Sequence, residues 1–469
     1  MRTCRFLWLV LPVVAMTIGG CFAPRQDAVE EKQNPKGGAV NTEMKQPLAG
    51  STSCAGRACH GRLERTKDPD SKYTLDEFTT WVTTDPHVNA YHVLEMSRSQ
   101  EIAQRMNLKE EAHESPRCLA CHTTPEAAVK QTDPDLEAHV RQERTLGVGC
   151  EACHGNAKKW FGPHIETPWT KKNADEKTVL GFVEVTKSET LARRCVGCHV
   201  GSKGDSTRPD RDVNHDLIAA GHPRLNFEFS TYFHNLPVHW QPKKFPHVER
   251  WAVGQLVSAE AALDLLEYRA GANGGDDRVW PEFSEYDCFG CHHNLTHDPN
   301  GPVWRQAPDR PRNNRRRDAL TWGSWYFAVP RSLAELPHLK KLTDVMEVRR
   351  PDPAKVAKVI DKTREDLRAL HKEVQKWTED SAPARIKALR FGGPVERDWS
   401  WDAAEQTFLS LYALNQVAQD MELQARLDLL LPIRAFPPGF NSTRSLPPDH
   451  PNRFSPEEFF KTLRGGAPK

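Results

Sequence analysis

The spacing of apolar side chains predicts four helices in the second half of the chain. The clearest runs from about Glu249 to Arg269 and stops before Gly271, and we expect it to pack against a bound group. The other three are expected over residues 352–377, 401–421 and 423–431. The first of these three begins with Asp352 as the cap and Pro353 in the first turn.

The stretch that precedes these helices has a different pattern. Proline and glycine interrupt it repeatedly and alternating strand patterns are few, so we expect short helices joined by long loops. The whole chain is 27% charged and 38% hydrophobic, and no run of 18 apolar residues occurs beyond the N-terminus, which excludes an integral membrane protein. Because apolar side chains are scarce for 469 residues, a bound group is expected to fill part of the interior of a mainly α fold.

The N-terminus has the pattern of an export signal. Two arginines precede an apolar stretch that ends in Gly19-Gly20-Cys21, which resembles a bacterial lipobox. We therefore expect residues 1–20 to be a signal peptide, Cys21 to carry a lipid, and residues 21–53 to form a flexible tether. The protein would lie on the periplasmic side of a bacterial membrane, anchored in the bilayer by acyl chains. A plain signal peptide and a single anchor helix are the alternatives.

Ten of the twelve cysteines form five pairs, and a histidine directly follows each pair. Four pairs have the spacing C-x-x-C-H, the attachment signature of c-type haem, in which two thiols form thioethers and the histidine binds the iron. The remaining pair has four residues between its cysteines, which suits the same role if the loop bulges. The expected thioether cysteines are Cys54, Cys59, Cys118, Cys121, Cys150, Cys153, Cys195, Cys198, Cys288 and Cys291. The expected proximal histidines are His60, His122, His154, His199 and His292.

Paired cysteines have other uses, which must be weighed against haem attachment. They bind zinc, act as redox dithiols or form disulfides in exported proteins. None of these uses requires a histidine at the next position. With 20 histidines in 469 residues, five such neighbours by chance have a probability on the order of 10⁻⁷. The sequence therefore predicts five c-type haems, and haem attachment outside the cytoplasm agrees with the export signal.

Each iron has a second axial position, for which histidine is favoured over methionine because methionine is scarce after the signal. Three blocks of sequence bear on its identity: residues 149–155 with His164 following, residues 214–228, and Trp81 with residues 85–90. These blocks resemble multihaem cytochromes of the cytochrome c-554 family, and the resemblance covers about residues 54–297.

In that family, histidines at such positions bind the far face of a haem that belongs to another motif. Carried over to this chain, the resemblance implies distal ligands at His87, His164, His215 and His222, with His239 as a fifth candidate. The chain departs from the tetrahaem pattern of the family in having five motifs, one of them widened. It also carries a long C-terminal part without cysteine.

The predicted organisation is a pentahaem cytochrome domain followed by a helical region. The cytochrome domain covers residues 54–297, a Pro- and Arg-rich linker covers 298–330, and the helical C-terminal region covers 331–469. The 64 basic and 63 acidic side chains balance, so nucleic acid is not an expected partner.

Three functions remain open from the sequence. The leading hypothesis is an exported electron carrier with mostly bis-histidine haems, which exchanges electrons with redox partner proteins. The alternative is a multihaem oxidoreductase that acts on a small nitrogen or sulfur compound at a haem with an open distal position. The third is a binding lipoprotein held together by zinc or disulfides.

Overall fold

The computed structural model describes most of the chain after residue 47. The described residues are 48–68, 71, 73–205, 208–240, 246–271, 279–287, 295–298, 301–304, 320–323, 325–391, 401–431 and 456–465. The predicted signal peptide, the predicted lipidation site Cys21 and the fifth motif, with Cys288, Cys291 and His292, lie outside them. Internal contacts place Lys45–Lys469 in one unit, and the finer division of this unit into three regions stays a prediction.

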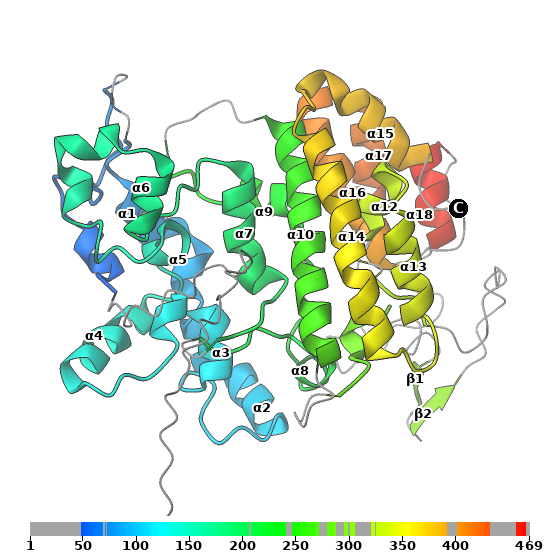
Figure 1. Ribbon diagram of the computed structural model, residues 1–469, viewed down its shortest axis with the longest axis horizontal. Coiled ribbons are helices and arrows are strands. Elements are labelled where there is room, and N and C mark those ends of the chain that lie inside the picture. Colours follow the sequence, from blue (N-terminus) through cyan, green and yellow to red (C-terminus); the bar gives the residue numbers. More distant parts are fainter. Residues whose placement is uncertain are drawn as a thin grey trace, which may run out of the picture. The chain divides into compact units, whose positions relative to one another are not determined.

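The first half of the chain folds into short helices joined by long loops, as predicted (Figure 1). These helices are α1 (Glu77–Thr84), α2 (Ser97–Arg105), α3 (Pro116–His122), α4 (Pro134–Thr145), α5 (Cys150–His154), α6 (Ala174–Val179), α7 (Ser188–His199), α8 (His215–Ala219) and α9 (Phe229–Asn235). Several of these helices begin at a capping residue or at a proline in the first turn. The α4 helix, for example, has Pro134 in its first turn and Asp133 as its cap, whose carboxylate accepts hydrogen bonds from two backbone amides.

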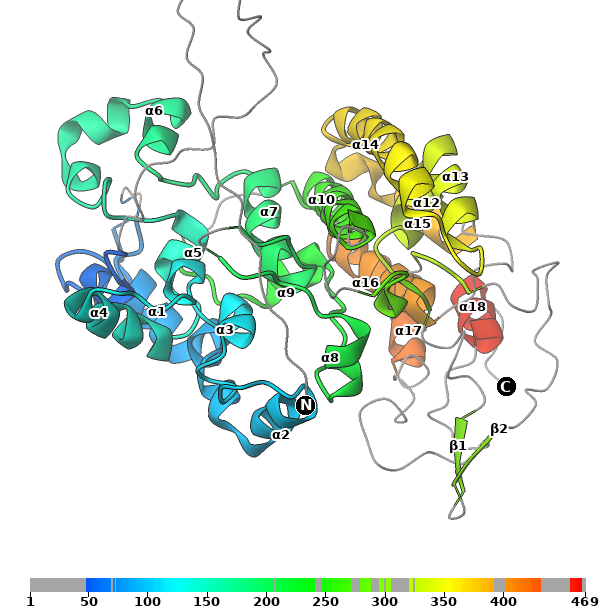
Figure 2. The same ribbon diagram turned by 60° about the horizontal axis from the view of Figure 1, so that its bottom comes forward.

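The second half consists of longer helices that pack side by side (Figures 1 and 2). They are α10 (His247–Ala270), α12 (Ala328–Leu333), α13 (Pro337–Met346), α14 (Pro353–Val374), α15 (Ala382–Phe391), α16 (Trp401–Ala418), α17 (Met421–Leu430) and α18 (Pro456–Arg464). The described strands β1 (Leu295–Asp298) and β2 (Gly301–Trp304) form an antiparallel hairpin. No helix among the residues described here is long and apolar enough to span a bilayer.

The four helices that the sequence predicts are all present, and the structure supplies their ends. The Asp352 carboxylate accepts a hydrogen bond of 2.9 Å from the amide of Ala354 and so starts α14. The expected helix over 401–421 ends at Ala418, because Gln419 has a φ of 52° and Asp420 caps α17. The fold is therefore mainly α, as expected.

The main hydrophobic core lies around α10. Large side chains of α10, such as Trp251 and Leu263, are fully buried together with residues of α7 and of α12 to α18. The prediction that this helix packs against a bound group is wrong for the part of the chain that the structure describes. It packs instead against α7, α9, α14 and α16, and none of its residues lines the cavity described below. A helix that is apolar on nearly all its faces is buried within protein.

Candidate haem-binding site

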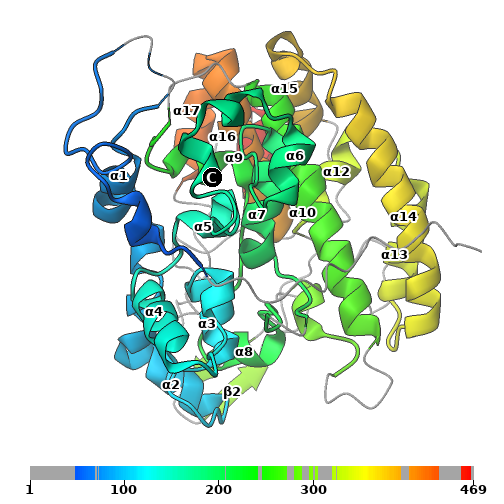
Figure 3. The same cartoon turned by 60° about the vertical axis from the view of Figure 1, so that its left-hand side comes forward.

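A cavity of about 2670 Å³ lies among the short helices of the first half. It is several times larger than the usual ligand pocket of about 300–1,000 Å³. The cysteines and the histidine of each of the first four motifs line it. Figure 3 shows the three helices that carry the second, third and fourth motifs, α3, α5 and α7, on the side of α10 that faces away from α14.

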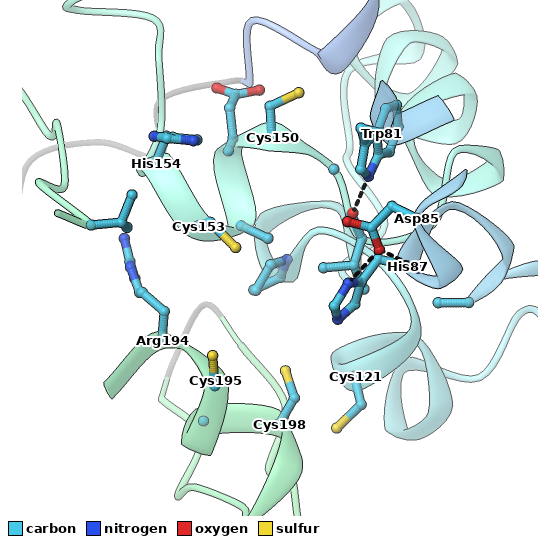
Figure 4. A pocket seen from close by; sticks show the side chains of 18 of the residues that line it. Trp81, Asp85, His87, Cys121, Cys150, Cys153, His154, Arg194, Cys195 and Cys198 are labelled. Carbon is cyan, nitrogen blue, oxygen red and sulfur yellow. Dashed lines mark hydrogen bonds and ion pairs between the residues drawn. The ribbon is translucent and has the colours of Figure 1, made fainter. Parts of the chain in front are cut away.

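Local helix geometry points each of these three motifs into the cavity. In α3, α5 and α7 the motif forms the C-terminal end of the helix, so the cysteines stand at positions i and i+3 and the histidine at i+4. These positions share one face of a helix, and both thiols and the imidazole therefore point the same way. Figure 4 shows Cys153, Cys195, Cys198 and Cys121 around the cavity.

The widened first motif reaches the same arrangement through turns. Cys54 ends a short 3₁₀ helix, and the amides of Cys59 and Gly61 both donate hydrogen bonds to the carbonyl of Gly56, at 2.8 and 3.0 Å. The four intervening residues therefore fold into a bulge, and both thiols line the cavity.

The thiols also show which motifs are neighbours. Cys54 of the first motif lies near enough to Cys150 of the third for each thiol to shift the pKa of the other, and the same holds for Cys121 of the second motif and Cys198 of the fourth. The α5 and α7 helices pack against each other and bring the third motif beside the fourth. The order in space is thus first, third, fourth and second.

Three histidine rings from elsewhere in the chain stand opposite motif histidines. The ring centres are 6.4 Å apart for His60 and His164, 6.4 Å apart for His122 and His222, and 6.1 Å apart for His199 and His87. Two imidazoles that bind one metal from opposite sides, with bonds of about 2.0 Å, have ring centres roughly 6 Å apart. Each pair therefore has the spacing of two axial ligands.

Several cavity histidines use Nδ1 for a hydrogen bond to the protein, which leaves Nε2 free to bind a metal. Metal-binding histidines characteristically use the second ring nitrogen in this way, since the hydrogen bond fixes the orientation of the ring. The Nδ1 partners are Glu77 for His60, Asp85 for His87, the carbonyl of Ala90 for His122, the carbonyl of Phe161 for His164, the carbonyl of Pro223 for His222 and the carbonyl of Pro237 for His239. By contrast, His139 uses its Nε2, which bonds the carbonyl of Leu48 at 2.9 Å.

Burial keeps two of the motif histidines neutral. Loss of solvent lowers the pKa of His154 and of His199 to about 4, and nearby histidines add to the effect. Neutral imidazole is the form that binds metals. The environment of the cavity therefore favours the ligand form of these side chains at neutral pH.

The other two predicted distal histidines, His239 and His215, do not stand opposite a motif histidine in the described residues. His239 lines the cavity, and its nearness contributes to the lowered pKa of His154 of the third motif. His215 begins α8 and does not line the cavity. Its ring meets that of Phe283 at 5.8 Å, and its amide donates a hydrogen bond of 2.8 Å to Glu282. Both contacts lie just before the fifth motif in the sequence.

The cavity also contains a basic side chain that the sequence analysis did not single out. Arg194 lines the cavity, and its Nε is buried without a hydrogen-bond partner among the described residues. Figure 4 shows it rising from α7 toward the side of the cavity where His154 lies. Its position directly before Cys195, on the motif-bearing face of a helix, was the available signal.

The donor set and the size of the cavity fit covalently attached haem. All eight cysteines of the first four motifs are free thiols. Each motif presents two thiols and one imidazole, and three motifs have a second imidazole at axial spacing. A search of the described residues found no cluster of three or more histidine, cysteine or acidic side chains arranged to hold a bare metal ion.

Comparison with known proteins gives one match. Residues 54–155, which contain the first three motifs, match the model of the family described as cytochrome c554 and c-prime. Searches of curated proteins and of solved structures found no match.

Proposed function

We propose, on the premise that residues 54–155 match the cytochrome c554 and c-prime family, that the protein is an exported, lipid-anchored electron carrier with five covalently bound haems. The family supports the coarser statement that the chain is a c-type cytochrome of electron transfer. The number of haems, their bis-histidine ligation and the lipid anchor are the proposed details.

The observation that carries the proposal is the set of three imidazole pairs at 6.1–6.4 Å. From it we assign His164 to the haem of the first motif, His222 to the second and His87 to the fourth. For the third motif we assign His239, which lines the same cavity as His154. For the fifth we assign His215, because it contacts the residues just before that motif.

The bound haem iron would supply reversible one-electron chemistry, with potentials set by axial ligands and burial. The chain itself would contribute the order of the sites. Since thiols of the first and third motifs are neighbours, as are those of the second and fourth, electrons would pass in the order first, third, fourth, second. Redox partner proteins would supply and remove these electrons.

The assignment is tested by three single variants, His164→Met, His222→Met and His87→Met. Methionine as an axial ligand raises the potential of a haem, so each variant should raise the midpoint potential of one haem and leave the others unchanged. His92→Met is the matched control, because His92 bonds Glu95 on the surface and does not line the cavity. Unchanged redox titrations in all three variants would refute the ligand assignment.

The lipid anchor is tested separately. Cys21→Ser should move the protein from the membrane fraction to the soluble periplasmic fraction without changing its haem content. Retention of the variant in the membrane would refute lipidation at Cys21.

One observation at the third motif favours the alternative function, a multihaem oxidoreductase with an open distal position. His154 and His239 are not among the ring pairs within 6.5 Å in the described residues, and the ring of His239 instead meets that of Trp240 at 5.0 Å. An iron without a sixth ligand could bind a small nitrogen or sulfur compound there. A high-spin ferric signal that disappears when nitrite or hydroxylamine is added, together with turnover, would support this alternative. A wholly low-spin spectrum would favour the carrier.

A further inference from the structure

The haem-free helical region makes specific contacts with the loop that carries His222. This loop leaves α8 and runs through His222 to Phe229, where α9 begins. On its N-terminal side, Arg105 of α2 donates a hydrogen bond of 3.0 Å to the carbonyl of Ala220, and Arg98 donates one of 2.8 Å to that of Gly221. Its C-terminal side is held by residues more than 95 positions further along the chain.

The strongest of these contacts is an ion pair. Arg224, two residues after His222, donates hydrogen bonds of 2.8 and 2.9 Å to the two carboxylate oxygens of Asp402 in the first turn of α16. The Asp402 side chain is 2% exposed and that of Arg224 is 16% exposed. Removing one partner of a buried ion pair is costly, so the pair favours one position of the loop.

Three neutral side chains fix the backbone that follows, two of them just before α12 and one in α16. The indole nitrogen of Trp325 and the side-chain amide of Gln406 each donate a hydrogen bond of 3.2 Å to the carbonyl of Phe227. The hydroxyl of Tyr326 lies 3.3 Å from the carbonyls of both Leu225 and His199. The loop and the motif histidine of α7 are therefore tied to the same tyrosine.

Phe227 connects the loop to the cavity, which its side chain lines. Its ring is 4.9 Å from that of His199 with an angle of 20° between the planes, so the two rings are stacked. His222, five residues earlier, faces His122 at 6.4 Å. The same loop thus reaches two neighbouring motifs, the second and the fourth.

We propose that residues 325–326 and the helical C-terminal region together hold His222 in place as the sixth ligand of the second haem. Asp402 and Tyr326 are positioning residues, which act through Arg224 and through the backbone of the loop. The inference rests on the proposed function, since it requires a haem on the second motif. It gives the cysteine-free C-terminal part of the chain a defined role in the ligation of the cavity.

The test is Asp402→Ala in the full-length protein, with spin state as the readout. We expect all five haems to remain attached, while about one fifth of the ferric haem changes from low-spin to a state that binds cyanide or nitric oxide. Added imidazole should restore the low-spin spectrum. Asp420→Ala is the matched control, because Asp420 caps α17 in the same region and makes no contact with the loop; it should leave the spin state unchanged.

The outcomes separate the inference from the proposed function. A wild-type protein without covalent haem would refute the proposed function itself. Five haems and a wholly low-spin spectrum in Asp402→Ala would refute the inference alone.

If Asp402→Ala does not fold, Tyr326→Phe provides the measurement, since it removes only a hydroxyl. Loss of its hydrogen bonds to the loop should raise the rate of cyanide binding at one haem about five- to tenfold. A rate equal to that of the wild type would overturn the proposal.

Discussion

The region around the cavity and the region around α10 differ in how many apolar side chains they bury. Around α10, aliphatic and aromatic side chains from α7 and from α12 to α18 form one large buried cluster. Around the cavity, the described residues form only small clusters of three to five buried apolar side chains. The difference indicates that the described part of the first half encloses a large group, whereas the described helices around α10 bury their apolar side chains against one another.

Polar contacts replace part of the missing apolar packing near the cavity. Glu143 is 2% exposed, and its carboxylate accepts hydrogen bonds of 2.8 and 2.7 Å from the amide and hydroxyl of Ser51. Glu151 accepts one of 2.8 Å from the amide of Gly50. These two buried carboxylates hold the segment that leads into Cys54, and so they help to close the wall around the first motif.

The largest expected effect comes from emptying one site of the cavity. In the double variant Cys150→Ser/Cys153→Ser the third motif loses both thioether positions. Leaving even a quarter of the 2670 Å³ cavity void, at about 24 cal/mol per Å³, would cost more than the roughly 5–15 kcal/mol that stabilises an ordinary domain. We expect no folded protein to accumulate, as measured by haem staining of the full-length band. A variant with four haems and a wild-type melting temperature would show that the cavity does not depend on its contents.

A smaller effect is expected from the other half of the molecule. Leu411 of α16 is fully buried in the main core. Leu411→Ala should lower the free energy of unfolding by about 2–5 kcal/mol, the usual cost of such a truncation. Haem content and the ferric spectrum of the folded protein should be unchanged. Chemical denaturation followed by tryptophan fluorescence measures the first quantity, and loss of haem together with stability would contradict the separation of the two interiors.

The smallest expected effect is electrostatic. Arg194 lines the cavity with its Nε buried, whereas its neighbour Arg193, which also lines the cavity, is half-exposed and its charge is paired with Glu189 and Glu260. A buried positive charge favours the reduced, less positive haem, so Arg194→Gln should lower the potential of at least one haem by on the order of 50 mV, given about 59 mV for a tenfold change in a one-electron equilibrium. Arg193→Gln should produce a much smaller shift. Equal shifts would show that the burial of Arg194 has no particular effect.

The sequence predicts local features of this molecule better than its long-range contacts. The helix expected over Glu249–Arg269 is found at His247–Ala270, because caps and apolar spacing are local signals. Its partners were not predictable, since an all-round apolar helix fits against protein and against a bound group equally well. Motif spacing predicts c-type haem, the blocks around the motifs resemble one family of multihaem cytochromes, and residues 54–155 match the model of that family.

The opposing histidines show where a single sequence is insufficient. Resemblance to the family drew attention to His164 and His87, yet their partners belong to motifs far away in the chain. His164 follows the third motif but faces His60 of the first, and His87 precedes the second motif but faces His199 of the fourth. These pairings arise from the packing of separate helices, which apolar spacing along the chain does not encode.

The central claim is that five haems are covalently attached to ten cysteines. Intact-mass analysis of the purified, exported protein tests it most directly, combined with a pyridine haemochrome assay of the same sample. The account predicts a chain processed at Cys21 that carries the mass of five haems and the matching absorbance. A chain mass without added haem would contradict it, and the cavity would then need a different occupant.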